Sequence, residues 1–348
     1  MTARSGSQAL PFVRSFVRWE SLLGLVVIAL IWLGASVSPV FLSAQNFSNL
    51  MAAVIEVAIM ALPMTLIVIT GEIDLSVESM AGLAVAVLGF LWAAGVPLDA
   101  AIPVVLVVGA LGGLLNGLLV TRVGLPSLVV TLGTLALFRG LALVVLGPKG
   151  VSQFPEPFTT FGFGTVPGTP VPYPLIVFVA LAVVLGVVLH GTWIGRQIYA
   201  VGKNPGTARY SGVEVSRIKL LLFVLSGVVS ALAGVILTAR FASARADIGQ
   251  GLTLTVVTVV LLGGVNIFGG RGTIVGVALA ALTLAILGNV LRLTNISAEI
   301  QSIAVGLLLI ISVVIPNLAH QIPSAIDRAR GGRRSSAGSV RPGEAVGP

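Results

Sequence analysis

The sequence predicts an all-α integral membrane protein with about ten transmembrane helices. Charged residues make up only 9% of the chain and apolar residues 56%, whereas soluble domains carry roughly 25% charged residues. So few charges cannot cover a globular surface with polar side chains, and a lipid surrounding removes that need. Apolar runs long enough to cross a bilayer core, about 20 residues each, recur between residues 20 and 318.

Ten spans follow from the places where Gly, Pro and charged residues interrupt these runs. The first is predicted to be a retained helix, because its apolar run from Ser21 to Val37 is longer than that of a typical signal peptide. The third and eighth start beside acidic and glycine residues, so we expect broken rather than straight helices. The spans lie near 20–37, 50–70, 75–95, 99–120, 126–147, 173–190, 217–238, 251–268, 272–293 and 298–318.

Basic residues predict the orientation. Lys and Arg gather near the N-terminus, around 196–219 and beyond 328, as in cytoplasmic loops. Placing both termini inside leaves 15 of the 20 basic residues on the cytoplasmic side. The chain then divides into a cytoplasmic N-terminal segment (1–19), a transmembrane domain (20–318) and a cytoplasmic tail (319–348), which is expected to be disordered. This clustering argues against nucleic-acid binding, despite the net charge of +8.

The residue inventory also limits the chemistry. The chain has no cysteine, which excludes disulfides and thiol catalysis, and its two histidines, His190 and His320, stand alone. We therefore expect no metal site, no cofactor and no catalytic residues. No G-x-x-x-x-G-K-[S/T] motif is present, so ATP binding by this chain is not expected.

An offset of 173 residues aligns several landmarks of the sequence. The second to fifth spans then overlay the seventh to tenth, and the copies have opposite membrane orientation because an odd number of spans separates them. Inverted repeats of this kind build many transporters; chance agreement in a low-diversity apolar sequence is the alternative. The aligned pairs are Asp74 with Asp247, Asn116 with Asn289, and Gly133 with Gly306.

Three acids lie within seven residues between the second and third spans. Glu72, Asp74 and Glu78 would be costly at membrane depth unless they were solvated or paired. Asp74 and Ser76 are placed to cap the following helix by accepting from its first N–H groups. A simple helix cap and a hinge or pathway segment explain the stretch equally well. The residues assigned to a pathway or hinge are Asp74, Ser76, Asn116, Asp247 and Asn289.

Segment 195–213 is the longest predicted cytoplasmic loop. Its turn residues at 202 and 204–206 precede a short helix predicted from Thr207 to Ser211, ending at Gly212. On composition alone an ordinary positively charged loop is the simpler interpretation. A second glycine-rich stretch, 261–273, indicates a tight crossing between two helices, and small residues predict close helix packing elsewhere. These small residues are Gly113 and Gly117, and Ser226, Ser230 and Gly234.

Four ordered motifs, at 71–79, 125–140, 195–213 and 261–276, resemble the permease family of ribose-, xylose-, arabinose-, rhamnose- and autoinducer-2-type ABC importers. The resemblance runs from about 25 to 318 and is closest to the rhamnose and autoinducer-2 permeases. It departs from the family pattern where Glu72 and Glu78 replace glycines. It implies an inner-membrane permease, not an enzyme, that translocates a monosaccharide or similar small polar solute.

The resemblance also implies partners. These are an ABC ATPase, a periplasmic or lipoprotein sugar-binding protein, and a second permease subunit in a homo- or heterodimer. Segment 195–213 would dock on the ATPase, with positive φ at Gly202 and Gly212 and a small Ala208 that seats the helix in a groove. The residues implied in this contact are Gly195, Arg196, Gly202, Asn204, Pro205, Ala208 and Gly212. The alternative is an ion-coupled secondary transporter, which would need deep carboxylates; only Glu56 qualifies clearly.

Overall fold

The computed structural model describes residues 19–297, 299–311 and 314, and its regular structure over that range is helical, apart from isolated bridges. Seven helices are long and apolar enough to cross a membrane, and three apolar helices are shorter. Each of the ten predicted spans overlaps one of these, so the all-α membrane class is confirmed. The long ones are α2 (Trp19–Val37), α3 (Ala44–Ile69), α5 (Leu98–Leu118) with the π-helical turn η1 (Leu119–Val123), α6 (Ser127–Leu146), α8 (Tyr173–Gly191), α11 (Val215–Phe241) and α13 (Ile274–Leu293). The short ones are α4 (Val77–Ala93), α12 (Leu252–Leu262) and Glu299–Ile311.

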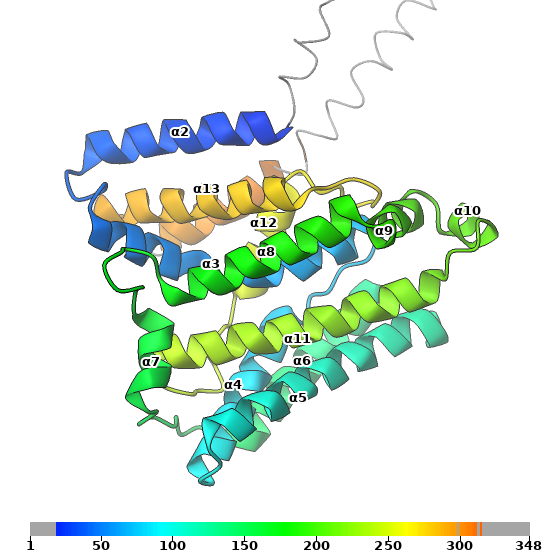
Figure 1. Cartoon of the computed structure of the whole chain (residues 1–348), viewed down its shortest axis with the longest axis horizontal. Helices are drawn as coiled ribbons and strands as arrows, with labels where there is room; N and C mark the ends of the chain where they lie inside the picture. Colours follow the sequence, from blue (N-terminus) through cyan, green and yellow to red (C-terminus); the bar gives the residue numbers. More distant parts are fainter. Residues whose placement is uncertain (1–18, 298, 312–313, 315–348) are drawn as a thin grey trace, which may run out of the picture.

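Helix α3 forms the centre of the molecule. Its most apolar window is 89% buried, against 17% for the windows of α2 and α8. In Figure 1, α2 lies along the upper edge of the bundle and α8 runs in front of α3. Ser43 caps α3 by accepting from the backbone N–H of Asn46. The apolar side chains that α2 and α8 leave exposed suit contact with lipid tails.

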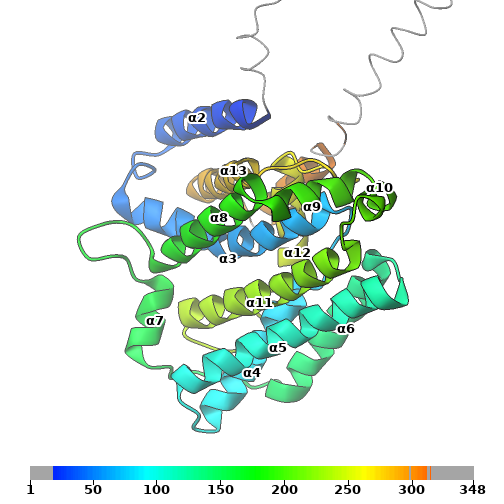
Figure 2. The same cartoon turned by 45° about the vertical axis from the view of Figure 1, so that its right-hand side comes forward.

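The helices form two groups, and each group contains one helix from the other copy of the predicted repeat: α11 in the first group and α3 in the second. Helix α11 packs against α4 and α5, with α6 beside α4, whereas α3 packs against α12, α13 and α8. Both views show these two groups one above the other (Figures 1 and 2). The groups meet where α3 contacts α11.

Glycines let α5 and α11 approach closely, as the small residues predicted. A methyl group added to Gly113 would collide with the backbone of Phe223, and one added to Gly109 would meet the backbone of Gly227. A similar contact joins Gly263, after α12, to Gly276 in α13. Helix packing therefore explains both sets of glycines.

The two ends of the bundle differ. Helix α7 (Glu156–Phe163) lies at one end and α9 (Trp193–Lys203) and α10 (Pro205–Tyr210) at the other (Figure 1); we call them the α7 end and the α10 end. The break expected within the third span is absent, because α4 is continuous from Val77 to Ala93, whereas the eighth span stops early, since α12 ends at Leu262. Residues 70–76, the first link, separate α3 from α4, and residues 242–251, the second link, separate α11 from α12. The predicted tail 319–348 and His320 lie outside the described residues.

Candidate functional site

A buried polar cluster surrounds Asp74 in the first link. Its carboxylate accepts from the backbone N–H of Ser76 at 3.0 Å, from the Ser76 hydroxyl at 2.6 Å and from the Ser226 hydroxyl of α11 at 2.7 Å. Asn116 of α5 donates to Ser76 Oγ at 2.9 Å. Asp74 is 2% exposed and Asn116 1%, so these bonds replace water for groups that would otherwise be costly to bury. Three of the predicted pathway or hinge residues therefore meet at one place.

The predicted helix cap is only partly present. Ser76 occupies the N-cap position of α4, but its side chain accepts no bond from the helix. Its hydroxyl donates to Asp74 instead, because the buried carboxylate is the stronger acceptor. The polar residues of the first link thus bind neighbouring helices more than they stabilise the start of α4, the helix that follows the link.

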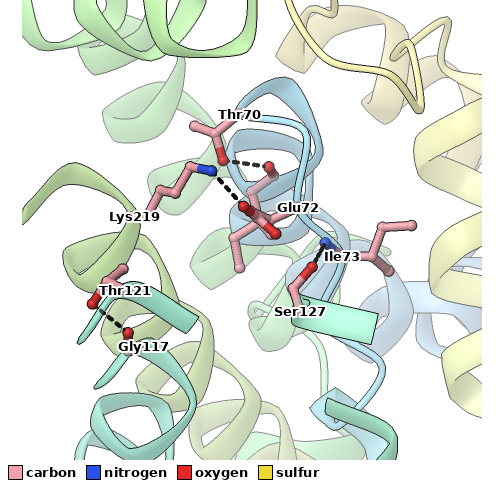
Figure 3. Close-up of polar contacts among 8 residues, drawn as sticks. Thr70, Glu72, Ile73, Gly117, Thr121, Ser127 and Lys219 are labelled. Carbon is pink, nitrogen blue, oxygen red and sulfur yellow. Dashed lines mark hydrogen bonds and ion pairs between the residues drawn. The ribbon is translucent and has the colours of Figure 1, made fainter. Parts of the chain in front are cut away.

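All three acids of this stretch have partners. Glu72 forms an ion pair with Lys219 of α11, which Figure 3 shows beside the link. Glu78 Oε1 lies 3.9 Å from Arg139 Nη2 of α6, and Glu78 Oε2 accepts from the backbone N–H of Thr253 at 2.8 Å. Of the two expected ways to offset their cost, solvation or pairing, these acids use pairing.

Helix α6 also binds the first link. Ser127 accepts from the backbone N–H of Ile73 at 3.2 Å, a contact visible in Figure 3, and Thr131 donates to the Ile73 carbonyl at 3.3 Å. Together with the contacts to α5 and α11, they join the link to three helices. The link can therefore move only if those contacts move or break.

The other two predicted pathway residues lie elsewhere. Asp247 is exposed in the second link, where Arg245 donates to it at 2.9 Å. The hydrogen bonds from Arg245 lower the pKa of Asp247 below its usual value. Asn289 exchanges amide hydrogen bonds of 3.0 and 2.8 Å with Asn46 of α3. Neither residue belongs to the Asp74 cluster.

Helices α9 and α10 form a compact element at the α10 end. Asn204 caps α10 by accepting from the backbone N–H of Thr207 at 3.0 Å, and Gly212 ends it with φ +82°. The expected short helix exists, although it begins at Pro205 rather than Thr207. Lys203, at the end of α9, and Arg209, within α10, are exposed. This element offers a basic, protruding surface.

Two expectations for this element are wrong. Gly202 lies in α9 and does not adopt a positive φ; it must be small because a methyl group would collide with the Ile69 carbonyl and the backbone N–H of Gly270. Ala208 is 4% exposed and is packed within this chain, so its methyl group does not face a partner. Gly195 is likewise buried, against the carbonyl of Leu189.

Three further polar contacts between helices could hardly be predicted from the sequence. Ser226 stood out only as a small residue, and Lys219 only as one more basic residue of a cytoplasmic loop. Glu56 pairs with Arg240 at 2.8 Å across α3 and α11, although the two residues are far apart in the chain. The small-residue stripe of α11 was the available signal for Ser226.

A cavity of about 590 Å³ lies between α3, α12, α13 and the helix 299–311. Its wall is mostly apolar, with the polar side chains of Thr255, Arg292 and Gln301 among its lining residues. Cavities of this size suit small solutes. Few polar groups on an apolar wall would bind such a solute weakly.

Comparisons with known proteins identify the class. Residues 46–313 match the family described as branched-chain amino acid transport system / permease component. The chain belongs to this family of ABC importer permeases, whose ATPase is a separate subunit. This membership removes the ion-coupled transporter as an alternative.

Relatives named autoinducer 2 import system permease protein LsrD are similar along most of the chain. The protein from Photorhabdus luminescens is 36% identical over 91% of this chain and 98% of its own length. The one from Yersinia pseudotuberculosis (strain YPIII) is 37% identical over 92% and 98%. The one from Yersinia enterocolitica is 41% identical over 74% and 79%. No solved structure matches the chain.

Proposed function

We propose that this permease carries autoinducer 2, or a similar small polar solute such as a monosaccharide, into the cell. Similarity to the autoinducer 2 permeases over more than nine tenths of both chains carries the proposal. The partly polar cavity beside α12, lined by Thr255, Arg292 and Gln301 among mostly apolar residues, supports a small, weakly held polar solute.

Uptake in cells tests this substrate. A strain whose own autoinducer 2 permease is deleted would receive this chain with its cognate ATPase and binding protein. We expect the cells to clear autoinducer 2 from the medium, in an ATP-dependent way that survives a proton-gradient uncoupler. Clearance of rhamnose or ribose instead would reassign the solute, and no clearance of any of the three would reject the proposal.

We propose that the α10 end is cytoplasmic, with both termini on that side. The exposed Lys203, Arg209 and Arg217 lie at this end, and basic residues prefer the cytoplasmic side. Cysteine replacing Lys203 should react only with reagent inside the cell, and cysteine replacing Lys149 only with reagent outside. Labelling of Lys203→Cys from outside intact cells would reverse the orientation.

The α9–α10 element is our proposed contact for the ATPase. It protrudes from the bundle, and Tyr210 on α10 is 96% exposed; exposed aromatic residues often anchor protein interfaces. Since Ala208 is buried, Ala208→Glu would disturb α10 itself, so Tyr210→Ala is the cleaner test. We expect it to weaken co-purification with the ATPase, whereas Phe268→Ala, at another exposed aromatic of the same end, would not. The reverse result would move the contact to the α12–α13 connection.

The proposal includes two further partners, a solute-binding protein at the α7 end and a second permease subunit. An importer of this class needs both to deliver the solute and to form a pathway. Cross-linking of the assembled complex should yield two permease copies for every two ATPase domains. A complex with a single permease copy would reject the dimer.

The inverted repeat is also part of this proposal. Under the 173-residue offset, α3 (26 residues) corresponds to α11 (27), and α5 (21) to α13 (20). Each copy also packs one helix against the other copy: α11, from the second copy, packs on α5, and α3, from the first copy, packs on α13. In an experimental structure, 50–147 should superpose on 217–318 after rotation about an axis in the membrane plane. Failure of that superposition would reject the repeat.

A further inference from the structure

The ion pair between Glu72 and Lys219 joins the first link to the beginning of α11. Their side chains are only 16% and 15% exposed. Figure 3 shows the Lys219 ammonium directed at the Glu72 carboxylate, next to Thr70 at the end of α3. A pair shielded in this way is screened by salt much less than an exposed pair.

Lys219 follows α10 closely along the chain. The backbone N–H of Val213 donates to the Ala208 carbonyl at 3.0 Å, which fixes α10 to the segment that leads into α11 at Val215. Lys219 lies about one helical turn further on. A displacement of α10 therefore reaches Lys219 with little flexible chain between them.

Helix α11 contacts the first link at a second point. Ser226 donates to Asp74 at 2.7 Å and lies seven residues, about two turns, beyond Lys219, so both side chains project from the same face of α11. Glu72 and Asp74 are held by that one face. The link is thus fixed to α11 at two positions.

Helix α9 reaches the same region by another route. Gly202 packs against the carbonyl of Ile69, and the backbone N–H of Gly270 donates to that carbonyl at 2.8 Å. This contact positions the end of α3 but holds no charged group. Among the residues that the structure describes, the Glu72–Lys219 pair therefore connects the link by charge to α11, and through α11 to the α9–α10 element.

We propose that the Glu72–Lys219 ion pair transmits movement of the α9–α10 element to the first link, and so couples ATP hydrolysis to opening of the pathway. Moving α11 without the link would leave a shielded charge unpaired, which is strongly unfavourable. The link therefore follows α11, with α4 and α5 responding through the Asp74 cluster and α6 through its contacts with Ile73. Both residues are positioning residues, and the inference rests on the proposed contact between α9–α10 and the ATPase.

Charge exchange tests this coupling. The variants are Glu72→Gln, Glu72→Lys, Lys219→Glu and the double exchange Glu72→Lys with Lys219→Glu. Glu214 and Arg217 form a matched control, an ion pair near the start of the same helix with side chains 69% and 74% exposed. Each permease is reconstituted with its ATPase and binding protein in vesicles, and solute moved per ATP hydrolysed is measured with ATPase co-purification.

We expect each single variant to bind the ATPase normally but to move about tenfold less solute per ATP, a typical size for coupling between two sites. The double exchange should recover to within about twofold of the original protein, whereas exchange of Glu214 and Arg217 should change nothing, as expected for an exposed pair. Unchanged transport per ATP in the single variants would overturn the inference. So would a double exchange that inserts and binds the ATPase but stays uncoupled.

Glu72→Gln covers the case in which the charged single variants fail to insert, because it removes the charge and keeps the shape. Normal coupling in Glu72→Gln would then overturn the inference. Failure of the proposed function has a different signature, since the unaltered complex would itself transport no solute. Failure of the proposed ATPase contact is distinct again, as Tyr210→Ala would then leave co-purification intact.

Discussion

The two links that separate the membrane helices correspond under the 173-residue offset but have opposite surroundings. Asp74 in the first link is buried and receives hydrogen bonds from Ser76 and Ser226. Asp247, its partner under the 173-residue offset, is exposed and is bound by Arg245 two residues away. One link is fixed to three neighbouring helices by long-range contacts, and the other keeps its acid in a local contact at the surface.

This difference separates sequence correspondence from function. A repeat can preserve an aspartate at both positions while the neighbours decide what it does. The first link lies at the α10 end, where Gly202 packs on the end of α3, so under the proposed ATPase contact it is the link that would receive force from the ATPase. The second link lies nearer the α7 end, where a solute would enter under the proposed orientation.

Removal of the Asp74 carboxylate should have the largest effect. Asp74→Ala leaves the hydroxyls of Ser76 and Ser226 and one backbone N–H buried without their acceptor, and each such group costs about 1–3 kcal/mol. We expect loss of folded permease in detergent, measured by size-exclusion chromatography and thermal melting. Asp74→Asn, which keeps one acceptor oxygen, should lose less. A fully stable Asp74→Ala protein would show that the cluster does not hold the first link.

Arg139 should come next, because it connects the two links. Its Nη1 donates to the carbonyl of Ala246 in the second link at 2.6 Å, and its Nη2 lies near Glu78 at the start of α4. Arg139→Leu removes both contacts, while Glu78 keeps the backbone N–H of Thr253. We expect a loss of about 1–3 kcal/mol in unfolding free energy, with Arg139→Lys in between. Equal stability of the original protein, Arg139→Leu and Arg139→Lys would mean that Arg139 does not connect the two links energetically.

The sequence predicted the order of the helices and the need to pair the acids, because both depend on local composition. It also predicted the short helix after Asn204, where the capping residue, the proline and the terminal glycine are close together. The partners of those acids could not be predicted, since Ser226 and Lys219 lie some 150 residues from the first link. Gly202 shows the same limit: the residue was singled out, but its reason is a neighbouring backbone rather than its own φ.

Loss of the amide pair between Asn46 and Asn289, at the α7 end of the bundle, should have a smaller effect than loss of the Arg139 contacts. Each side chain donates to the other, and both residues are buried. Asn289→Leu should destabilise by about 1–2 kcal/mol, because the Asn46 carbonyl oxygen loses its donor while its amide keeps only the Phe41 carbonyl, whereas changing both residues to Leu should recover part of the loss. Thermal melting of the two single variants and the double variant measures this coupling. Additive losses would show that the two amides act independently.

Asp247→Asn should have the smallest effect and is the sharpest test of the comparison. Its pair with Arg245 is solvent-exposed, with side chains 50% and 59% accessible, and such pairs contribute little to stability. Because hydrogen bonds from Arg245 lower the pKa of Asp247, any stability from this pair is present above the ordinary pKa and is lost only as pH falls through the lowered value. Between about pH 5 and 8 the carboxylate stays charged, so neither the substitution nor pH in that range should change the melting temperature.

Uptake by Asp247→Asn should stay within about twofold of the original protein, as expected for a weak surface pair. A loss of uptake as large as that of Asp74→Asn, at unchanged stability, would show that the second link acts directly on the solute and that the two aspartates share a role despite their different surroundings.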